Sequence, residues 1–378
     1  MQAVILAAGK GTRMYPMTTE KPKPLIEVAN KPVLEHNLDQ MLGIVEEAII
    51  VVGYKKDMII KKLGDNYMGM KLTYVVQEEQ LGTGHAVLQA ESKVTGKFLV
   101  LNGDDLYSRK DMESLAKYDT CILVKRHKDA SAFAAVVVKD GKVVDIVEKP
   151  KEFISDLVNV GMYCFSLEVF EVLKNLKKSE RGEYEITDAV RELAKQGKVH
   201  YEEVKGFWIP VGYPWQILDA TEELLEENKD ISIKGKLEEG VVIDGSVDVG
   251  EGTVVGKGTL LGGNVVMGKN CQIGENCVLT GFTAIADNCI IGANTILDNV
   301  IMGQESNLET DCVIRDSVLG ERASLNKGVK IENKKEKGTV KVNGGGKTYD
   351  SGKEKLGAFV GDGCQVCGQL ECGECVSK

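Results

Sequence analysis

Two glycines and two basic residues near the start of the chain have the types and spacing of a phosphate-binding site. Gly9 and Gly11 follow the apolar stretch 3–6, and the amide groups of a glycine turn approach an anion closely because no Cβ atom is in the way. Arg13 and Lys23 add positive charge a few residues later. Together these residues predict a site for a nucleoside triphosphate.

Two common glycine motifs do not fit this segment. The dinucleotide-binding fingerprint needs a third glycine, and this chain has Met14 in its place. A P-loop closes with Gly-Lys-Ser/Thr, whereas Lys10 lies between two glycines here. The segment therefore matches neither class.

Further motifs, spread over about the first 225 residues, resemble those of the sugar-1-phosphate nucleotidylyltransferases. The matching segments, in the order of that family, are 6–13, Lys23, 80–86, 102–104, 148–150, 159–161 and 208–212. The most similar pattern is that of the N-acetylglucosamine-1-phosphate uridylyltransferases, followed by glucose-1-phosphate uridylyl- and thymidylyltransferases. The resemblance implies a Mg²⁺-dependent enzyme that joins UTP or dTTP to glucose-1-phosphate or N-acetylglucosamine-1-phosphate. Its products would be an NDP-sugar and pyrophosphate.

The resemblance also implies roles for single residues. Arg13 would neutralise the triphosphate, and Lys23 would bridge the α-phosphate and the sugar phosphate. Asp104 ends an apolar stretch, where a carboxylate suits Mg²⁺; a helix cap is the alternative role, and Asp105 is the next candidate ligand. The amide of Gln77 matches the imide edge of uracil or thymine, and Glu148 and Asn159 would hold the sugar. The expected substrate-binding residues are Ala8, Gly9, Gly11, Thr12, Gln77, Gly82, Thr83, Glu148 and Asn159.

The chain departs from the family pattern at two positions. The family's second metal carboxylate, in Trp-x-Asp-x-Gly, is replaced by Pro210, which has no metal-binding group. A glycine that approaches the sugar in the family is Ala134 here, so an added methyl group narrows the expected pocket. These departures keep open a non-catalytic subunit that binds sugar nucleotides.

Alternating strand and helix patterns up to residue 229 predict the fold that positions these residues. Strands are expected at 48–52, 72–76, 98–101, 121–124, 136–138 and 162–165, and helices at 34–42, 58–63, 167–176, 186–194 and 215–227. This order predicts a Rossmann-like α/β domain, a mostly parallel mixed sheet covered by helices. Ligands of such sheets bind beyond the carboxyl ends of strands, where Gly9 and Asp104 are expected.

Residues 230–332 carry a hexapeptide repeat, in which an apolar residue recurs at every sixth position with two one-residue slips. This repeat predicts a parallel β-helix. In the hexapeptide proteins that it resembles, the helix is left-handed and trimers are frequent, so a homo-oligomer is expected. Such relatives also include acetyltransferases with a histidine base, and an enzyme that acetylates glucosamine-1-phosphate as well stays an alternative. The last histidine of this chain, however, is His200.

The cysteines of the repeat and the tail have different expected roles. Cys271, Cys277, Cys289 and Cys312 fall at one position of the repeat, where small side chains stack in the core. The tail, 333–378, contains a predicted exposed loop that includes 334–337 and 343–347, strands near 360 and 366, and two Cys-x-x-Cys pairs. Paired Cys-x-x-Cys motifs can hold a zinc ion, but these two pairs lie closer together than in the usual zinc sites. The sequence therefore leaves two alternatives, a bound metal ion and free thiols.

The composition agrees with a metabolic enzyme of several domains. A net charge of −10 over 378 residues argues against nucleic acid or an anionic membrane as a main partner. With ten cysteines outside any small secreted framework, and with no charged leader or long apolar stretch, a cytoplasmic protein is expected.

Overall fold

The computed structural model describes residues 1–128, 130–226, 230–335 and 337–378. The chain divides into two compact units. Unit 1 comprises residues 1–10 and 33–210, and unit 2 comprises residues 11–32 and 211–378. The boundary expected at residue 229, and Glu227 at the end of the last expected helix of the first domain, lie outside the described residues.

Unit 1 is built on a mixed 10-stranded sheet with the order β10-β11-β13-β9-β12-β7-β1-β4-β6-β5. Its strands are β1 (Gln2–Ala7), β4 (Glu47–Val52), β5 (Asn66–Tyr67), β6 (Met70–Val76), β7 (Phe98–Asn102), β9 (Cys121–Arg126), β10 (Ala134–Lys139), β11 (Lys142–Glu148), β12 (Leu157–Phe165) and β13 (His200–Glu203). The central strands β7, β1, β4 and β6 are parallel to one another, whereas β12 runs antiparallel to β7 and β9. The predicted α/β class with a mixed sheet is therefore confirmed.

Helices cover this sheet and contribute to its apolar core. They are α1 (Val33–Met41), α2 (Lys56–Leu63), α3 (Thr83–Gln89), α4 (Arg109–Leu115), α5 (Glu168–Lys174) and α6 (Ile186–Lys195), with the short η3 (Glu91–Lys93). From α3, α5 and α6, Val87, Phe170 and Val190 are buried in one cluster with Val4 and Phe98 of the sheet. The rings of Phe98 and Phe170 stack with their centroids 5.4 Å apart.

A two-stranded ladder lies apart from the large sheet in unit 1. Strand β8 (Asp105–Tyr107) pairs antiparallel with β14 (Trp208–Pro210). This ladder was not predicted from the sequence, and no bounds were predicted for α3 or α4.

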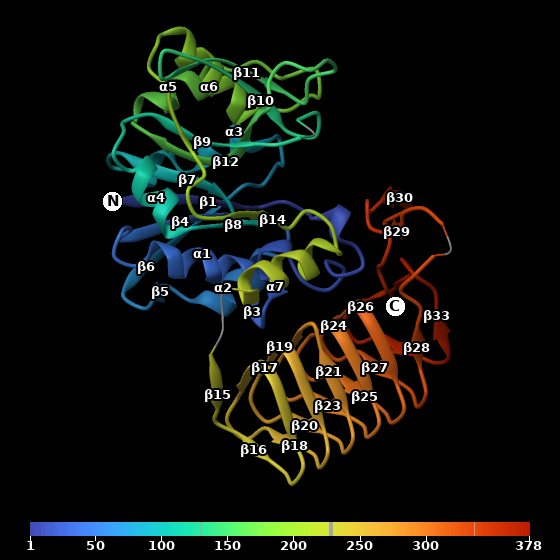
Figure 1. Cartoon of the computed structure of the whole chain (residues 1–378). Coiled ribbons are helices and arrows are strands. Elements are labelled where there is room, and N and C mark those ends of the chain that lie inside the picture. The colour runs from blue at the N-terminus through green and yellow to red at the C-terminus, as the bar shows by residue number, and fades with distance from the viewer. Residues whose placement is uncertain (129, 227–229, 336) are drawn as a thin grey trace. The chain divides into compact units, whose positions relative to one another are not determined.

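Unit 2 contains stacked parallel strands over the region of the hexapeptide repeat. They form an 11-stranded and a 7-stranded sheet, and Figure 1 shows β17, β19, β21, β24 and β26 side by side. The strands are β15 (Ile231–Ile233), β16 (Lys236–Leu237), β17 (Val242–Val249), β18 (Val254–Val255), β19 (Leu260–Met267), β20 (Gln272–Ile273), β21 (Val278–Thr280), β22 (Phe282–Ile285), β23 (Ile290–Ile291), β24 (Ile296–Met302), β25 (Asn307–Leu308), β26 (Val313–Leu319), β27 (Ser324–Leu325) and β28 (Lys330–Ile331). Hydrogen-bonded neighbours are 18 positions apart early in the stack and 17 apart later, which is the reason for the slips in the repeat.

Small polar side chains of the stack hydrogen-bond from one layer of strands to the next. The Sγ atom of Cys271 donates to the Ala286 carbonyl (3.1 Å), and the Oγ1 atom of Thr253 donates to the Gly268 carbonyl (2.6 Å). The four cysteines of the repeat are fully buried in the apolar cluster, as predicted: Cys271, Cys277, Cys289 and Cys312. Each buried donor is thus satisfied within the core.

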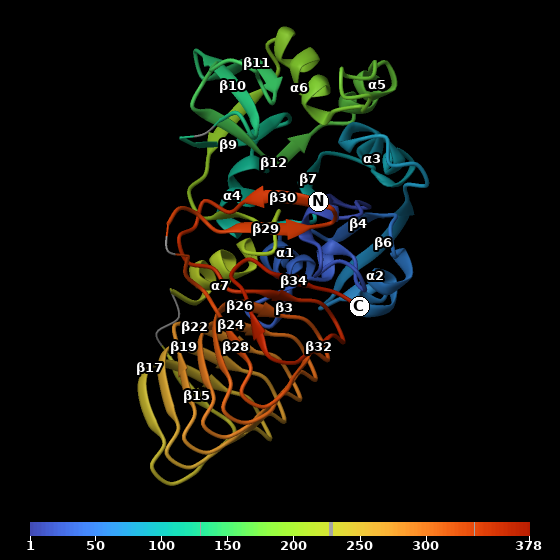
Figure 2. The ribbon, with the colours of Figure 1, turned by 90° about the vertical axis from the view of Figure 1, so that its right-hand side faces the viewer.

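The tail returns to the stack after a hairpin. Strands β31 (Phe359–Val360) and β32 (Gln365–Val366) lie where they were predicted, and β33 (Gln369–Leu370) and β34 (Cys375–Val376) follow. The predicted loop at 343–347 is instead the turn of a hairpin of β29 (Lys341–Gly344) and β30 (Lys347–Asp350), whose antiparallel strands Figure 2 shows. Gly345 and Gly346 have φ of 60° and 76°, the left-handed conformation that a two-residue hairpin turn requires. The loop prediction was wrong because the glycines that break regular structure also form this turn.

Residues 11–32 complete unit 2 together with one helix. They contain η1 (Thr12–Met14), η2 (Lys23–Leu25) and the short strands β2 (Glu27–Val28) and β3 (Lys31–Pro32). The helix is α7 (Gln216–Glu226), where the Thr221 hydroxyl accepts a hydrogen bond from the backbone of Ala29. Among the described residues, no helix is long and apolar enough to cross a membrane.

Candidate active site

In unit 1, three predicted site residues and one further glycine each follow one of four adjacent parallel strands. Asp104 and Gly9 lie two positions after β7 and β1, and Gly53 and Gln77 come directly after β4 and β6; these four strands lie next to one another in this order. Because the carboxyl ends of parallel strands share one edge of the sheet, these residues lie at the same edge. The expected location of Gly9 and Asp104 is confirmed.

The turn after β1 is fixed by hydrogen bonds at Ala8, whereas the space beside Gly9 contains no side chain of the described residues. The Ala8 carbonyl accepts hydrogen bonds from the Tyr54 amide (3.2 Å) and from the Gln80 Nε2 atom (2.9 Å). A Cβ atom on Gly53 would lie 2.9 Å from the Ala8 oxygen, so only glycine fits there. A Cβ atom on Gly9, by contrast, would have no heavy atom of the described residues within 4 Å. Gly9 therefore has room beside its backbone for a bound group.

Gln77 is fixed by the segment that begins α3. Its Nε2 atom donates to the Gly82 carbonyl (3.2 Å) and lies 3.0 Å from the Nδ1 atom of His85. Gly82 has φ of 111°, and a Cβ atom there would lie 2.6 Å from the Tyr184 oxygen, which makes glycine necessary. Within the motif 80–86, the sequence predicts His85 as a structural residue at a helix start, and His85 does lie in the first turn of α3. The amide nitrogen of Gln77 thus has a fixed direction.

Thr83 begins α3 and also contacts the next helix along this face. Its Oγ1 atom accepts a hydrogen bond from the amide of Ile186, the first residue of α6 (3.1 Å). The hydroxyl therefore satisfies an amide that the helix leaves without an internal partner. This contact joins the segment 82–83 to α6.

Asp105, the second of two neighbouring aspartates after β7, contacts aromatic side chains of the β8–β14 ladder. The Oδ2 atom of Asp105 accepts from the Trp208 indole nitrogen (3.3 Å) and lies 3.5 Å from the Tyr107 hydroxyl, which donates to the Val160 carbonyl (2.8 Å). Burial, and then the charges of Asp105 and Asp104, raise the pKa of Tyr107 well above its usual value, so this phenol stays protonated. These contacts hold the Asp105 side chain against the β8–β14 ladder.

The donor set around Asp104 fits a hard divalent cation held by few protein ligands. Asp104 is half-buried at the edge where Gly9 is open. Pro210 pairs with Asp105 across the β8–β14 ladder, so the position of the family's second carboxylate adds no oxygen ligand here. Among the described residues, no group of three or more His, Cys, Asp or Glu side chains is arranged to hold a metal ion, including the terminal Cys-x-x-Cys pairs. One carboxylate, with phosphate oxygens and water, matches the ligands that Mg²⁺ typically takes in nucleotide sites.

Three strands align the residues expected at the sugar. Glu148 of β11 is paired with Ala134 of β10, and Ala134 is paired with Asn159 of β12. The side-chain nitrogen of Asn159 donates to the Tyr163 hydroxyl (2.7 Å), and Arg181 lies 3.4 Å from a Glu148 oxygen. The buried methyl group of Ala134 therefore lies in the row that joins the two polar residues.

Unit 2 holds the remaining predicted residues, Gly11, Thr12, Arg13 and Lys23. Gly11 has φ of 63°, and a Cβ atom there would lie 2.9 Å from the Cβ of Lys23, so the two backbones are in close contact. Thr12 begins η1 and Lys23 begins η2. The guanidinium carbon of Arg13 lies 5.2 Å from the centre of the Tyr213 ring, a cation–π distance.

Several residues that shape these sites were not found from the sequence. Gly53, Gln80 and Tyr163 in unit 1, and Tyr213 in unit 2, contact predicted residues through the fold. Only Gly53 had a local signal, a glycine directly after an apolar strand. The others follow no motif and are recognised by their contacts.

Two family profiles match consecutive parts of the chain. The profile described as "Nucleotidyl transferase" matches residues 2–227. The profile described as "GMPPB C-terminal domain" matches residues 227–343.

Curated relatives match one or both parts. The "Bifunctional protein GlmU" of Methanococcus maripaludis strain S2 is 40% identical over 371 residues, which cover 96% of this chain and 88% of the relative. The UTP–glucose-1-phosphate uridylyltransferase AglF of Haloferax volcanii is 37% identical over 239 residues, 60% of this chain and 98% of the relative.

A solved structure matches the nucleotide-binding part. It is a UDP-glucose pyrophosphorylase in complex with UDP-glucose, with a TM-score of 0.53 and 25% identity. The match covers 60% of this chain and 98% of that structure.

Proposed function

Because this chain belongs to the nucleotidyl transferase family and is a sugar-1-phosphate nucleotidylyltransferase that makes an NDP-sugar, we propose its substrates: UTP or dTTP, and glucose-1-phosphate or N-acetylglucosamine-1-phosphate. The observation that carries this proposal is the shared sheet edge at which Gly9, Gln77 and Asp104 follow adjacent parallel strands. An open glycine backbone, a fixed amide and a carboxylate at one edge suit a phosphate, a base and a metal ion.

The proposed reaction is a direct in-line displacement. An oxygen of the sugar phosphate attacks the α-phosphorus of the nucleotide, the new P–O bond forms, and the bond to the departing pyrophosphate breaks. Since both reactants are anions, the barrier lies chiefly in bringing them together and in stabilising charge on the transferred group. Arg13 and Lys23 supply positive charge for this task, with Ala8, Gly9, Gly11 and Thr12 around the phosphates.

Asp104 is proposed to hold the divalent metal that enzymes of this family use, with Mg²⁺ as the ion. The ion, when bound, neutralises phosphate oxygens and lowers the energy of charge on the leaving group. Asp105 supports Asp104 indirectly, because its contacts with Trp208 and Tyr107 fix the backbone after β7.

The base and the sugar are assigned to the remaining residues of unit 1. Gln77, with Gly82 and Thr83, is proposed to read the imide edge of the pyrimidine. Glu148 and Asn159 are proposed to hold sugar hydroxyls or an acetamido group. The alignment of Glu148, Ala134 and Asn159 across three strands supports this assignment, because the three residues lie in one cross-strand row.

The C-terminal part is proposed to be a left-handed parallel β-helix that drives oligomerisation, a trimer or a multiple of one. The 17- and 18-residue spacing between paired strands supports a helical coil of three hexapeptides. We propose domain boundaries at 229/230 and 332/333, and the two family profiles that meet at residue 227 support the first. Ten free cysteines support a location in the reducing cytoplasm.

A second activity, acetylation of glucosamine-1-phosphate, is favoured by the 40% identity to a bifunctional relative. Against it stands the lack of any histidine after His200. The test is to incubate the protein with acetyl-CoA and glucosamine-1-phosphate and to measure free thiol. Release of thiol establishes the second activity, and the absence of release excludes it.

The proposed function is tested by pyrophosphate release from four nucleoside triphosphates with several sugar 1-phosphates. Release with UTP or dTTP and one of the two named sugars supports the proposal. Nucleotide binding without pyrophosphate release from any pair favours the non-catalytic subunit instead.

A further inference from the structure

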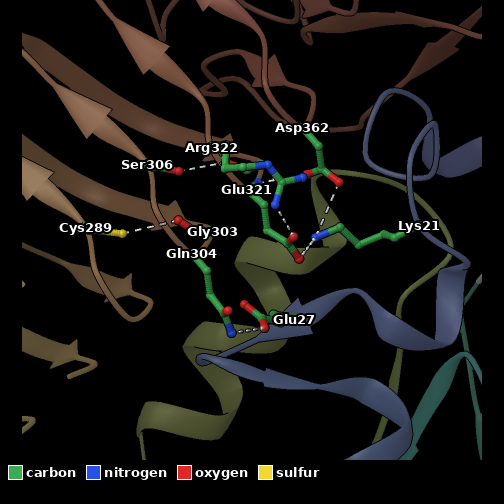
Figure 3. A network of polar contacts seen from close by, with 10 residues as sticks. Lys21, Glu27, Cys289, Gly303, Gln304, Ser306, Glu321, Arg322 and Asp362 are labelled. Carbon is green, nitrogen blue, oxygen red and sulfur yellow. Dashed lines mark hydrogen bonds and ion pairs between the residues drawn. The ribbon is translucent and has the colours of Figure 1, made fainter. Parts of the chain in front are cut away.

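A buried lysine close to the phosphate-binding lysine has no role in the reaction described above. Lys21 is 7% exposed, and its Nζ atom forms ion pairs with Glu321 and, at 3.5 Å, with an Oδ2 atom of Asp362 (Figure 3). Glu321 follows β26, and Asp362 follows β31, the strand paired with β26 in the next layer. The three charges thus join the segment 11–32 to two successive turns of the stack within unit 2.

The two carboxylates are themselves held in place. The Oδ1 atom of Asp362 accepts from the Glu321 amide (2.8 Å), and Arg322 donates to the second Glu321 oxygen (3.3 Å). A Cβ atom on Gly320 would lie 2.4 Å from that Asp362 oxygen, so the turn needs a glycine to admit the carboxylate. Burial raises the pKa of Asp362, and the nearby Lys21 charge opposes this shift. The two carboxylates are therefore held in positions where both can form an ion pair with the ammonium group of Lys21.

Only one residue separates this cluster from Lys23, and it is rigid. Pro22 has φ of −73° and ψ of 148°, and its carbonyl accepts from the Leu25 amide (3.0 Å) in η2. On its other side, Lys23 has its Cβ in close contact with Gly11. The backbone of Lys23 is thus fixed between an ion cluster and a glycine contact.

We propose that Lys21 is a positioning residue, which holds the Lys23 backbone through its ion pairs with Glu321 and Asp362. The inference rests on the proposed function of Lys23 in phosphate binding. Two other contacts hold the same segment: Gln304 donates to Glu27 (3.2 Å, Figure 3), and Asn30 donates to the Ile285 carbonyl (2.7 Å). Lys21 is the anchor nearest to Lys23, so its loss affects Lys23 most directly.

Lys21→Met tests this role, because methionine keeps much of the length and removes the charge. A displacement of about 1 Å at a reacting group costs up to roughly 100-fold in rate, so kcat for NDP-sugar formation is expected to fall at least about tenfold. The KM values are expected to stay within about twofold. Asp362→Asn is expected to lower kcat by a smaller factor. Lys21→Arg keeps the positive charge and is expected to retain most of the wild-type kcat.

The matched control is Lys353→Met, which breaks the ion pair of Lys353 with Asp219 (2.5 Å), also within unit 2 but outside segment 11–32. Its kcat is expected to equal that of the wild type. Equal losses in Lys353→Met and Lys21→Met would overturn the inference, because the effect would then be one of general stability. An unchanged kcat in Lys21→Met would overturn it as well.

Hydrogen exchange gives a readout that does not depend on the reaction. In Lys21→Met the amides of Leu25 and Ile26, which bond to the Pro22 and Lys23 carbonyls, are expected to exchange at least about tenfold faster, while those of β19 keep their rates. Unchanged exchange at these two amides rejects the anchoring role. A wild type that releases no pyrophosphate rejects the proposed function and leaves the exchange result to decide the anchoring.

Discussion

Pro210 lies directly opposite Asp105 in the antiparallel ladder of β8 and β14. The family's pattern has a carboxylate at this position, next to the strand end that carries Asp104. The ladder therefore places residue 210 opposite Asp105, and a proline at this position supplies no carboxylate. We expect Pro210→Asp to lower the half-saturating Mg²⁺ concentration severalfold, because two carboxylates hold the ion more tightly than one.

Pro210→Asn is the control for this variant, since it relaxes the proline backbone in the same way without adding charge. A Mg²⁺ titration of pyrophosphate release measures both. If the asparagine variant shifts the titration as far as the aspartate variant, the added carboxylate is not a ligand.

Alanine substitutions test the roles proposed for Lys23 and Asp104. Lys23→Ala and Asp104→Ala are each expected to lower kcat by at least about 100-fold, because each removes a group that offsets charge in the transition state. Asp119→Asn, which alters a carboxylate that is 90% exposed and outside the site, is expected to leave kcat unchanged. Near-normal turnover in either alanine variant would contradict the assigned roles, provided that circular dichroism shows a folded protein.

Ala134 controls the room between Glu148 and Asn159. We expect Ala134→Gly to lower the KM for the bulkier N-acetylglucosamine-1-phosphate relative to glucose-1-phosphate by up to roughly tenfold, since one methylene changes discrimination by about that much. Ala135→Gly carries the same backbone cost on the opposite face of β10 and is expected to leave the KM ratio unchanged. If the ratio of the two KM values is the same in the wild type, Ala134→Gly and Ala135→Gly, the sugar does not bind beside Ala134.

The hairpin of β29 and β30 contributes to the environment of Arg13 within unit 2. The ring of Tyr349 meets that of Tyr213 edge-on at 5.3 Å, and Tyr213 faces the Arg13 guanidinium. Tyr349→Ala is expected to raise the KM for the nucleotide about two- to fivefold, because a displaced Tyr213 ring weakens the cation–π contact. Tyr349→Phe keeps the ring and is expected to behave as the wild type, so a raised KM in the phenylalanine variant would implicate the hydroxyl instead.

One carboxylate of unit 1 couples stability to pH. Hydrogen bonds from Lys71, Thr73 and Gln2 lower the pKa of Glu47 to about 2, although burial opposes the shift. Because the folded pKa lies below the ordinary value of 4.5, the stabilisation is complete above pH 4.5 and is lost as the pH falls toward 2. After a discount for the exposed Lys71, Glu47→Gln is expected to lower the free energy of unfolding by about 1–2 kcal/mol at pH 7.

Urea denaturation at pH 7 and pH 3 measures this effect. The difference between wild type and Glu47→Gln is expected to shrink at the lower pH. A difference that stays constant between the two pH values would show that the ionised form of Glu47 contributes nothing specific.

Periodicity and motif order predicted the central sheet and the edge of it that carries Asp104, because both depend on residues close in sequence. The motif around His85 indicated a helix start but not the bounds of α3, which begins at Thr83, between two glycines, where a Cβ atom on Gly84 would lie 3.0 Å from the Tyr184 oxygen. Packing against a distant segment, rather than propensity, decides that helix. Lys21 gave no signal at all, since its partner Glu321 lies 300 positions away. Long-range pairs of this kind follow no local pattern.

The hydrogen bonds that run from one layer of unit 2 to the next have a consequence for how such chains change in evolution. Cys271 and Thr253 each satisfy their donor on a carbonyl of the following layer, so a block of 17 or 18 residues repeats the same bonds. Duplication or deletion of one whole block would leave the interior bonds intact. An insertion of another length keeps them only where it leaves the stack as a loop, as the segment with the β29–β30 hairpin does between β26 and its partner β31, 41 positions later.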